Sequence, residues 1–338
     1  LSHPVFEGNP VTEFDTFTLR AGFNNSYLWS AGDAARMHYL QDQWIRDAYR
    51  AMGQESGYGN FVHVYVNGLY WGLYNATERP SAPYCADHFG GDKSEWDAIN
   101  SSEAVDGTKT AWTTLQNLAT AGIADETAYQ AIQQYLNVTN LVDYMLVNFY
   151  GGNQDWDNHH RYAARRRVPG AGFMFFCWDA ERCLESPAGN DKTGVNEADK
   201  PSRIYAQLRA YPEFRRLFGD RAHRHLFNNG ALTPEPAKAL FATLTNQIYR
   251  AMVGESARWG DKLREPPFTR DADWLNGANC VHWEMNTFLP QRTAAFLTQL
   301  RNAGLYPATV APAFSPQHGG RVARGFSLTM SAPAGIIY

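Results

Sequence analysis

Apolar and polar side chains alternate in the first part of the chain, which is the period of half-buried β-strands. Residues 14–20 set Phe17 and Leu19 against polar neighbours and predict one such strand. Residues 61–66 (FVHVYV) and 69–78 (LYWGLYNATE) predict two more, and the Asn67-Gly68 pair between them predicts a tight hairpin turn.

Apolar residues recur at helical spacing in three other regions. Residues 33–52 open with Asp33 as a helix cap and carry an apolar stripe at Met37, Leu40, Trp44, Ile45 and Ala48. A helical stretch over about 110–150 ends in NLVDYMLVNFY, and most of the chain from about 200 to 304 is also predicted to be helical. A Gly/Asn/Asp-rich loop at 185–200 precedes this last region.

A strand pair separates the later helical regions. A polar loop (151–160, GGNQDWDNHH) leads into a short strand near 161–166, a Pro-Gly turn and a second strand (172–179, GFMFFCWD). Strands first and helices later, around a central hairpin, predict an α+β fold rather than a doubly wound parallel sheet. Large rings on the apolar faces of these elements favour burial, so we expect six to be buried: Trp44, Tyr65, Trp71, Tyr144, Phe176 and Trp178.

The composition changes at Pro307. Residues 307–320 are rich in Pro and Gly, and FSLTMSAP (326–333) alternates like a strand. We therefore expect residues 1–306 to form one unit, and residues 307–338 to be a linker and the truncated start of a separate β-domain. No apolar run reaches the length of a membrane span.

Overall composition narrows the class of protein. The chain has 338 residues, 44% of them hydrophobic, and a formal net charge of −4. It can bury a sizeable core, and it has no basic field to suggest nucleic acid as a partner. Four cysteines without a CxxC pair argue against a structural zinc site. Cys177 and Cys183 suit either a disulfide or two small buried residues.

Carboxylates and amides gather on both sides of the short strand pair. The loop carries Asp155, Asp157 and Asn158, and Asp179 follows the second strand. Strands joined by a turn bring their outer ends together, so the loop and Asp179 should lie side by side. Like charges repel unless a cation joins them, and such oxygens suit Mg²⁺ or Mn²⁺ with substrate phosphates. We therefore predict that Asp155, Asn158 and Asp179 share a metal site of the kind that phosphoryl transfer uses.

Other roles are open to the same residues. Asp and Asn side chains in a polar loop often only make hydrogen bonds to the backbone of a turn. We favour that role when the loop is considered alone, but not when the loop and Asp179 are considered together. The basic run 165–167 could receive phosphates, although a solvated turn flank is favoured for at least two of its arginines. His159 and His160 would suit a zinc or manganese hydrolase, which ranks lower because no further His stands at useful spacing.

Five segments together resemble the CotH kinase family. These are VYVNGLYWGLYNATER (64–79), NFYGGNQDWDNHHRYAAR (148–165), GFMFFCWDAER (172–182), ESARWGD (255–261) and FLPQRTAAFLTQL (288–300). The second is similar to the family's N-x-D-W-x-N-N segment, and the third to its W-D-x-D strand end. The resemblance spans about residues 5–306, and the tail from Pro307 resembles the start of a chitobiase-type C-terminal β-domain.

The resemblance implies an atypical protein-kinase-like, two-lobed fold that transfers phosphate from ATP, with Mg²⁺ or Mn²⁺, to Ser or Thr of a protein. It also implies a bacterial location, secreted, in the spore coat or at the cell surface. By position it assigns catalysis to Asp155, metal binding to Asp179, Asn158 and Glu181, and nucleotide binding to Arg20, Glu78 and Asn153. We expect Glu78 to pair with a cation, with Arg20 as the first candidate.

Three positions depart from the family pattern. Glu181 stands where the family has Asp, and His159 stands at the second Asn. No strand Lys is obvious, so Arg20 is the nearest cation to hold phosphates. Two other functions therefore stay open: a noncatalytic surface or coat module that keeps the fold, and a metal-dependent phosphohydrolase.

Overall fold

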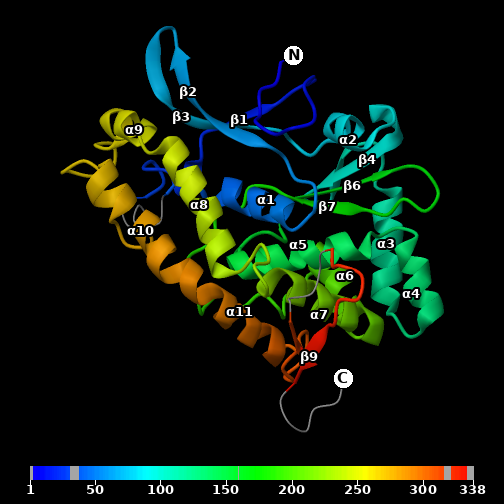
Figure 1. The fold of residues 1–338 in the computed structure, drawn as a ribbon. Coiled ribbons are helices and arrows are strands. Elements are labelled where there is room, and N and C mark those ends of the chain that lie inside the picture. The colour runs from blue at the N-terminus through cyan, green and yellow to red at the C-terminus, as the bar shows by residue number, and fades with distance from the viewer. Residues whose placement is uncertain (1–2, 31–37, 159, 316–320, 333–338) are drawn as a thin grey trace.

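The computed structural model describes residues 3–30, 38–158, 160–315 and 321–332 (Figure 1). Within these residues it contains eleven α-helices and three small antiparallel sheets, so the expected α+β class is confirmed. The strands are β1 Thr18–Arg20, β2 Gly59–Val66, β3 Leu69–Thr77, β4 Trp96–Asn100, β5 Glu103–Asp106, β6 Arg161–Arg166, β7 Met174–Cys177, β8 Ala313–Ser315 and β9 Thr329–Ser331.

Helices make up most of the second half. The α-helices are α1 Gln41–Ala51, α2 Ala82–Phe89, α3 Thr110–Ala121, α4 Glu126–Gln133, α5 Val138–Gly151, α6 Pro201–Leu208, α7 Pro212–Leu226, α8 Pro234–Ile248, α9 Ala251–Trp259, α10 Val281–Trp283 and α11 Leu289–Asn302. The described residues also contain two 3₁₀ turns, η1 Phe23–Asn25 and η3 Lys93–Glu95, and two π-helical segments, η4 Arg270–Leu275 and η5 Glu284–Phe288.

The first sheet has the strand order β1-β3-β2, with antiparallel neighbours. Its hairpin turns at Asn67 and Gly68, both with positive φ, as the sequence predicted. The expected strand over 14–20 is reduced to β1, and its apolar residues Phe17 and Leu19 are exposed. That expectation was wrong about the buried face, because Thr18 and Arg20, and not Leu19, are the half-buried residues of β1.

The second sheet has the order β5-β4-β6-β7 and lies between α2 and α5. Successive residues of β7 point to opposite faces. Phe175 packs against Tyr144 of α5 with ring centroids 5.4 Å apart, and Phe176 packs against Tyr84 of α2 at 5.7 Å. Helices thus cover both faces of the sheet, which fixes the ends of β6 and β7.

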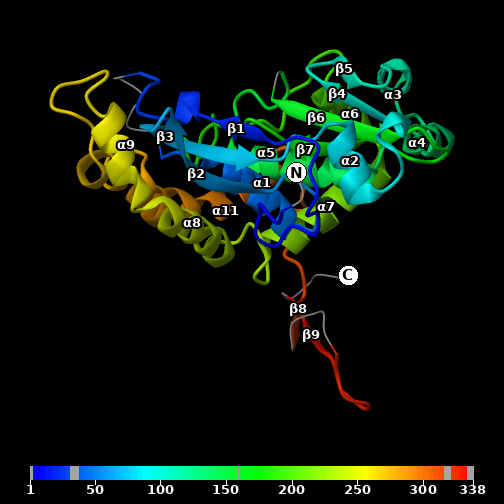
Figure 2. The same cartoon turned by 90° about the horizontal axis from the view of Figure 1, so that it is seen from above.

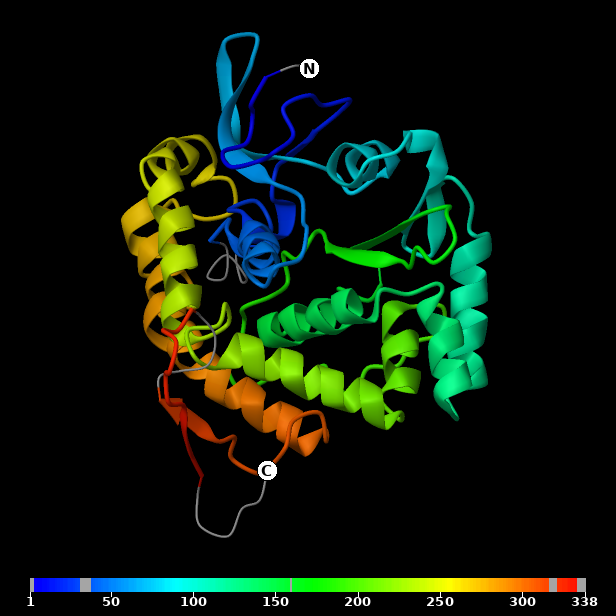
Figure 3. The ribbon, with the colours of Figure 1, turned by 45° about the vertical axis from the view of Figure 1, so that its right-hand side comes forward.

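Helix α5 is the centre of the molecule and is buried nearly all round. The Asn137 side chain accepts the Asn140 N–H to begin it, and Gly152 with φ 58° ends it. Helices α1, α6, α7 and α11 pack around it, and Figure 3 shows α7 and α11 below it. A helix that is buried on nearly every side fits only such a central place.

The helix predicted over 33–52 is shorter than expected. Asp33 and Met37 lie outside the described residues, and α1 begins at Gln41. Tyr39 has φ 66°, a left-handed conformation that no helix can contain. The backbone N–H of Tyr39 donates to the Asn25 carbonyl instead, which turns the chain before α1.

The expected burial of large rings is confirmed for Trp44, Tyr144, Phe176 and Trp178. It was wrong for Tyr65 and Trp71, which are 61% and 38% exposed. Both lie on the part of the β2–β3 hairpin that extends beyond β1 (Figure 1).

The tail after Tyr306 is separate from the packed core. Strands β8 and β9 pair with each other and extend away from the rest of the molecule (Figure 2). The assignment of residues 307–338 to a β-domain stays a prediction. Cys177 and Cys183 are two buried thiols and not a disulfide, and burial raises the pKa of both. No helix among the described residues is long and apolar enough to cross a membrane.

Candidate functional site

The loop between α5 and β6 is held firmly on its inner side. The Asn153 N–H and side-chain amide donate to the backbone and side chain of Asn148. Asp157 is buried and accepts from the N–H and the hydroxyl of Ser202, at 3.0 and 2.5 Å. Arg161 donates to carbonyls of the loop. These contacts leave Asp155 as the partly exposed carboxylate of the loop.

Asp155 and Asp179 meet at one imidazole. His160 Nδ1 lies 3.2 Å from Asp155 Oδ1, and His160 Nε2 lies 3.6 Å from Asp179 Oδ2. Burial disfavours the charged imidazole, but the hydrogen bond to Asp155 and the charge of Asp179 outweigh it, so the pKa of His160 is raised. The loop and the end of β7 are therefore neighbours, as the strand-pair argument predicted.

Arg20 of β1 contacts three carboxylates. It binds Asp179, lies 2.9 Å from Glu181 Oε1, and its Nε lies 3.6 Å from Asp42 Oδ2. Its guanidinium also lies over the Trp178 ring at 4.8 Å. Burial disfavours the cation, yet these acids raise its pKa above the ordinary value. Burial raises the pKa of Glu181, whose side chain is more deeply buried than that of Asp179.

Asp42 is a site residue that sequence reasoning missed. It stands in the first turn of α1, is buried, and accepts the Ala180 N–H at 2.9 Å. Burial alone would raise its pKa, but Arg46 and Arg20 hold that pKa below the ordinary value. No local pattern pointed to Asp42, because a polar residue of an amphipathic helix is expected to face solvent.

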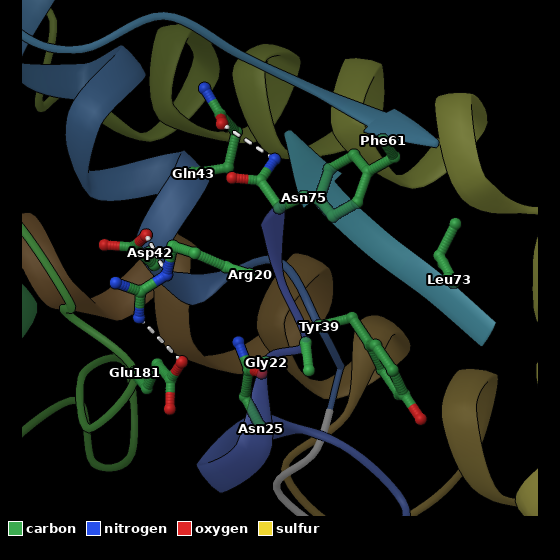
Figure 4. A pocket seen from close by; sticks show the side chains of 11 residues that line it. Arg20, Gly22, Asn25, Tyr39, Asp42, Gln43, Phe61, Leu73, Asn75 and Glu181 are labelled. Atoms are coloured by element: carbon green, nitrogen blue, oxygen red, sulfur yellow. Dashed lines mark hydrogen bonds and ion pairs between the residues drawn. The ribbon is translucent and has the colours of Figure 1, made fainter. Parts of the chain in front are cut away.

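A small recess of about 20 Å³ lies beside Arg20, between β1, β3 and α1 (Figure 4). Phe61 and Leu73 form an apolar wall, and the Gln43 and Asn75 amides are hydrogen-bonded to each other at 3.1 Å. Gly22 is required at its mouth, since φ is +63° and a Cβ there would lie 2.5 Å from Asn25 Oδ1. Its walls are apolar with a few polar groups and a cation at one end, but it is far smaller than ligand sites of about 300–1,000 Å³, so a nucleotide could enter only if these walls moved apart.

Other predicted site residues lie elsewhere. Glu78 is buried, accepts the Tyr58 N–H at 3.0 Å and lies 2.9 Å from His88 Nε2, so its expected pairing with Arg20 was wrong. Asn158 accepts from Lys200 rather than pointing to Asp179. Asn153 is buried, and its Oδ1 has no hydrogen bond within the described chain.

The basic run does not serve the site. Arg166 and Arg167 lie at the far end of β6 from the loop and pair with Glu95 and Asp97 of the η3–β4 segment. Arg165 lies over the Tyr135 and Phe173 rings. A phosphate-binding role for this run is therefore not supported.

The carboxylates are the type of ligand that a hard cation prefers, but they do not form a complete coordination shell. No group of three or more His, Cys, Asp or Glu side chains is arranged to hold a metal in the described part of the chain. Arg20 pairs with Asp179 and Glu181, and His160 Nδ1 lies beside Asp155, in this structure. Oxygen donors of this type suit Mg²⁺ when phosphates supply the remaining ligands. His159 lies outside the described residues.

Comparison with known families gives one result. A family model described as "CotH kinase protein" matches residues 6–292, which covers the first two sheets, the recess and the loop. No curated protein matches the chain.

Proposed function

The chain belongs to the CotH kinase family, and from that premise we propose that it transfers the γ-phosphate of ATP to a Ser or Thr hydroxyl of a protein. One observation carries this proposal. Arg20 joins Asp42 of α1 to Asp179 after β7, and His160 joins Asp179 to Asp155. Protein kinases need the same four parts: a strand cation paired with a helix acid, a loop Asp, and a second Asp after it.

Each residue then has a distinct role. Arg20 holds phosphate oxygens at the polar end of the recess, and Asp42 keeps its guanidinium in place. Phe61 and Leu73 would enclose the base once the recess has widened. Asp155 accepts the proton of the acceptor hydroxyl as its oxygen attacks the γ-phosphorus and ADP leaves.

Asp179 and Glu181 are the residues that would hold Mg²⁺ or Mn²⁺ together with the nucleotide. Such a cation neutralises charge that develops on the phosphate oxygens. Because Arg20 contacts both carboxylates now, its move toward the phosphates would release them for the metal.

Asp179→Asn tests the proposal. It keeps the shape of the side chain and removes the charge, so transfer of labelled γ-phosphate should fall by about a hundredfold or more while the melting temperature stays near that of the parent. Asp220→Asn, the same change at an exposed position of α7, should leave transfer unchanged. An active Asp179→Asn variant would contradict the assignment. Label released as free phosphate would favour the phosphohydrolase.

A noncatalytic module is the second candidate, because protein side chains already occupy all three carboxylates: Arg20 pairs with Asp179 and Glu181, and His160 contacts Asp155. A parent protein without an ATP-induced thermal shift, with Mg²⁺ or Mn²⁺, would favour it. We also propose a secreted or bacterial cell-surface location, and a kinase-like unit over residues 1–306 followed by the start of a β-domain. The family match ends at residue 292, and the β8–β9 pair stands apart from the core; both support that division.

A further inference from the structure

The outer edge of strand β2 has no neighbouring strand among the described residues. In the first sheet β3 lies in the middle, with β1 on one side of it and β2 on the other, so β2 is an edge strand. Its second half belongs to the tip of the hairpin, which rises beyond the helices (Figure 1). Proteins normally protect such an edge, because its free N–H and C=O groups can pair with another chain.

The hydrogen bonds of β3 show which residues of β2 present their backbone to this edge. His63 lies opposite Leu73, and the Leu73 N–H donates to Glu255 of α9, away from β2. The two residues therefore form a non-hydrogen-bonded pair, and the N–H and C=O of His63 point to the open side of β2. Alternation along the strand gives the same orientation to Phe61 and Tyr65. No other described residue bonds to these three backbone units on the open side.

The side chains agree with this alternation. The register shift beside Tyr65 places the extra residue, Trp71, in β3, so β2 itself stays regular. The Tyr70 ring packs against both His63 and Tyr65, with ring centroids 5.5 and 5.4 Å away. His63 and Tyr65 therefore share one face of the strand, as residues two positions apart should. A regular strand of this kind can accept a further strand along its edge.

The edge lacks the side chains that usually keep strands of different molecules apart. Residues 59–77 contain no Asp, Glu, Lys, Arg or Pro. The segment 61–66 (FVHVYV) is β-branched or aromatic throughout apart from His63. Six-residue segments with high β-propensity and low charge pair readily with copies of themselves. Tyr65 and Val66 are 61% and 48% exposed, so the end of this segment is uncovered in the single chain.

We propose that two copies of this chain pair in antiparallel fashion along β2, around a two-fold axis at His63. In this register His63 faces His63 of the second copy, and Phe61 faces Tyr65. Residues that present backbone groups thus meet residues that do the same, and each such pair exchanges two hydrogen bonds. The contact of Phe61 with Tyr65 adds an aromatic cross-strand pair. The first sheet then continues from one copy into the other.

This arrangement suits a second copy better than other occupants. A strand that pairs with itself across a two-fold axis brings any charged residue near the axis against a like charge, and residues 59–77 carry no Asp, Glu, Lys or Arg. An unrelated peptide would not share the self-complementary register. A lipid surface would leave the backbone groups of the edge without hydrogen-bond partners.

Sedimentation velocity of the full chain without nucleotide tests the pairing independently of the proposed function. The parent should change from monomer to dimer as its concentration rises. Tyr65→Lys puts a charge on the edge and should weaken the dimer by about tenfold or more. Leu69→Lys is the matched control, because Leu69 is 58% exposed at the same hairpin tip but belongs to β3, so this variant should dimerise like the parent. Both variants should keep the melting temperature of the parent.

Cross-linking locates the axis. The four native cysteines are buried, so a thiol introduced at an exposed position is the one that a reagent meets. A short bismaleimide should join two copies of the exposed His63→Cys variant and should not join two copies of the Leu69→Cys variant.

Three results would overturn the inference: a parent that stays monomeric at every concentration, equal weakening by Tyr65→Lys and Leu69→Lys, or cross-linking at 69 but not at 63. Binding of the parent to neutral lipid vesicles in place of dimerisation would assign the hairpin to a lipid surface and also overturn it.

Discussion

Asp155 and Asp157 stand two positions apart in one loop but have opposite surroundings. Asp155 is partly exposed and contacts His160, whereas Asp157 is buried against Ser202. Burial raises the pKa of Asp157, so its charge is a cost to the fold. An amide at 157 can still accept the Ser202 N–H and donate to its hydroxyl.

The same chemical change at the two positions should therefore give different results. Asp155→Asn should lower phosphate transfer by about a hundredfold or more, because a proton acceptor is lost, with little change in stability. Asp157→Asn should keep most activity, while Asp157→Ala should lose about 1–3 kcal/mol of unfolding free energy. Transfer of labelled phosphate and urea denaturation measure both. If the Asp157→Asn variant were inactive and the Asp155→Asn variant active, Asp157 would be the proton acceptor and Asp155 the structural residue.

Glu284 is an acid held in its neutral form by the fold. It is fully buried in η5, neither oxygen has a hydrogen bond within the described residues, and His38 Nε2 lies 3.6 Å away. Burial, with the charge of Glu185 added, raises its pKa well above 4.5. Burial lowers the pKa of His38 to about 3, so that imidazole is neutral and does not stabilise a charged Glu284.

Glu284→Gln should stabilise the protein at neutral and alkaline pH. Above pH 4.5 the unfolded chain releases this proton and the folded protein keeps it, so folding stability falls as pH rises toward the folded pKa. Below pH 4.5 the penalty is absent. Thermal unfolding should show a gain of about 1–3 kcal/mol for the variant at pH 8 and almost none at pH 4.5. A gain that does not depend on pH would show that the carboxyl is not protonated in the fold.

At the scale of elements, α9 completes an open strand edge. β1 pairs only with the last three residues of β3, so the preceding residues of β3, which pair with β2 on one side, have no strand on the other side among the described residues. Side chains of α9 take its place: Glu255 Oε2 accepts the Leu73 N–H at 2.8 Å, Trp259 Nε1 donates to the Trp71 carbonyl at 2.8 Å, and Arg258 Nε donates to the Tyr70 carbonyl at 3.2 Å. An uncovered edge would invite pairing with other chains.

Glu255 should be the strongest of these contacts. It also accepts from the Tyr39 hydroxyl at 3.2 Å, and both Leu73 and Tyr39 line the recess. Glu255→Ala leaves two buried donors without a partner, which should cost about 2–4 kcal/mol and reduce the ATP-induced thermal shift. Arg258→Ala should cost less than about 1 kcal/mol and keep that shift. If urea denaturation shows equal losses of unfolding free energy for the two variants, α9 acts through packing alone.

Local pattern predicted the elements where periodicity and turn residues agree. The Asn67-Gly68 hairpin, α5 and the β6–β7 pair followed from the sequence, and that pair correctly brought Asp155 toward Asp179. The pattern wrongly predicted a helix through Tyr39, which has a left-handed backbone conformation. That conformation depends on contacts with residues that are distant in the sequence. The pattern also failed for the rings of the β2–β3 hairpin, because alternation shows that one face differs from the other and not that anything covers it.

At the scale of the whole molecule, the site depends on contacts between distant segments. Arg20 and Asp179 are 159 positions apart, and Tyr39 and Glu255 are 216 apart. No local signal in the sequence pairs such residues, which is why Asp42 was missed and Glu78 was assigned the wrong partner. Ligand binding between the first sheet and α1 should therefore stabilise the molecule as a whole.

Truncation of the C-terminal tail can test where the packed unit of the chain ends. The last buried side chains before the tail are those of Leu305 and Tyr306, which are 1% and 7% exposed. The Tyr306 hydroxyl is hydrogen-bonded to His223 Nδ1 at 2.8 Å. Residues 321–332, by contrast, are exposed. A chain that ends after Tyr306 should unfold within about 0.5 kcal/mol of the parent, because the described residues that it loses are exposed or half-buried. A chain that ends after Gly304 also loses two buried side chains and should be less stable by about 3 kcal/mol or more. Thermal unfolding of the two truncations, with ATP-induced shifts as a check on the recess, separates these outcomes. A large loss in the longer truncation would show that the β8–β9 segment belongs to the core unit.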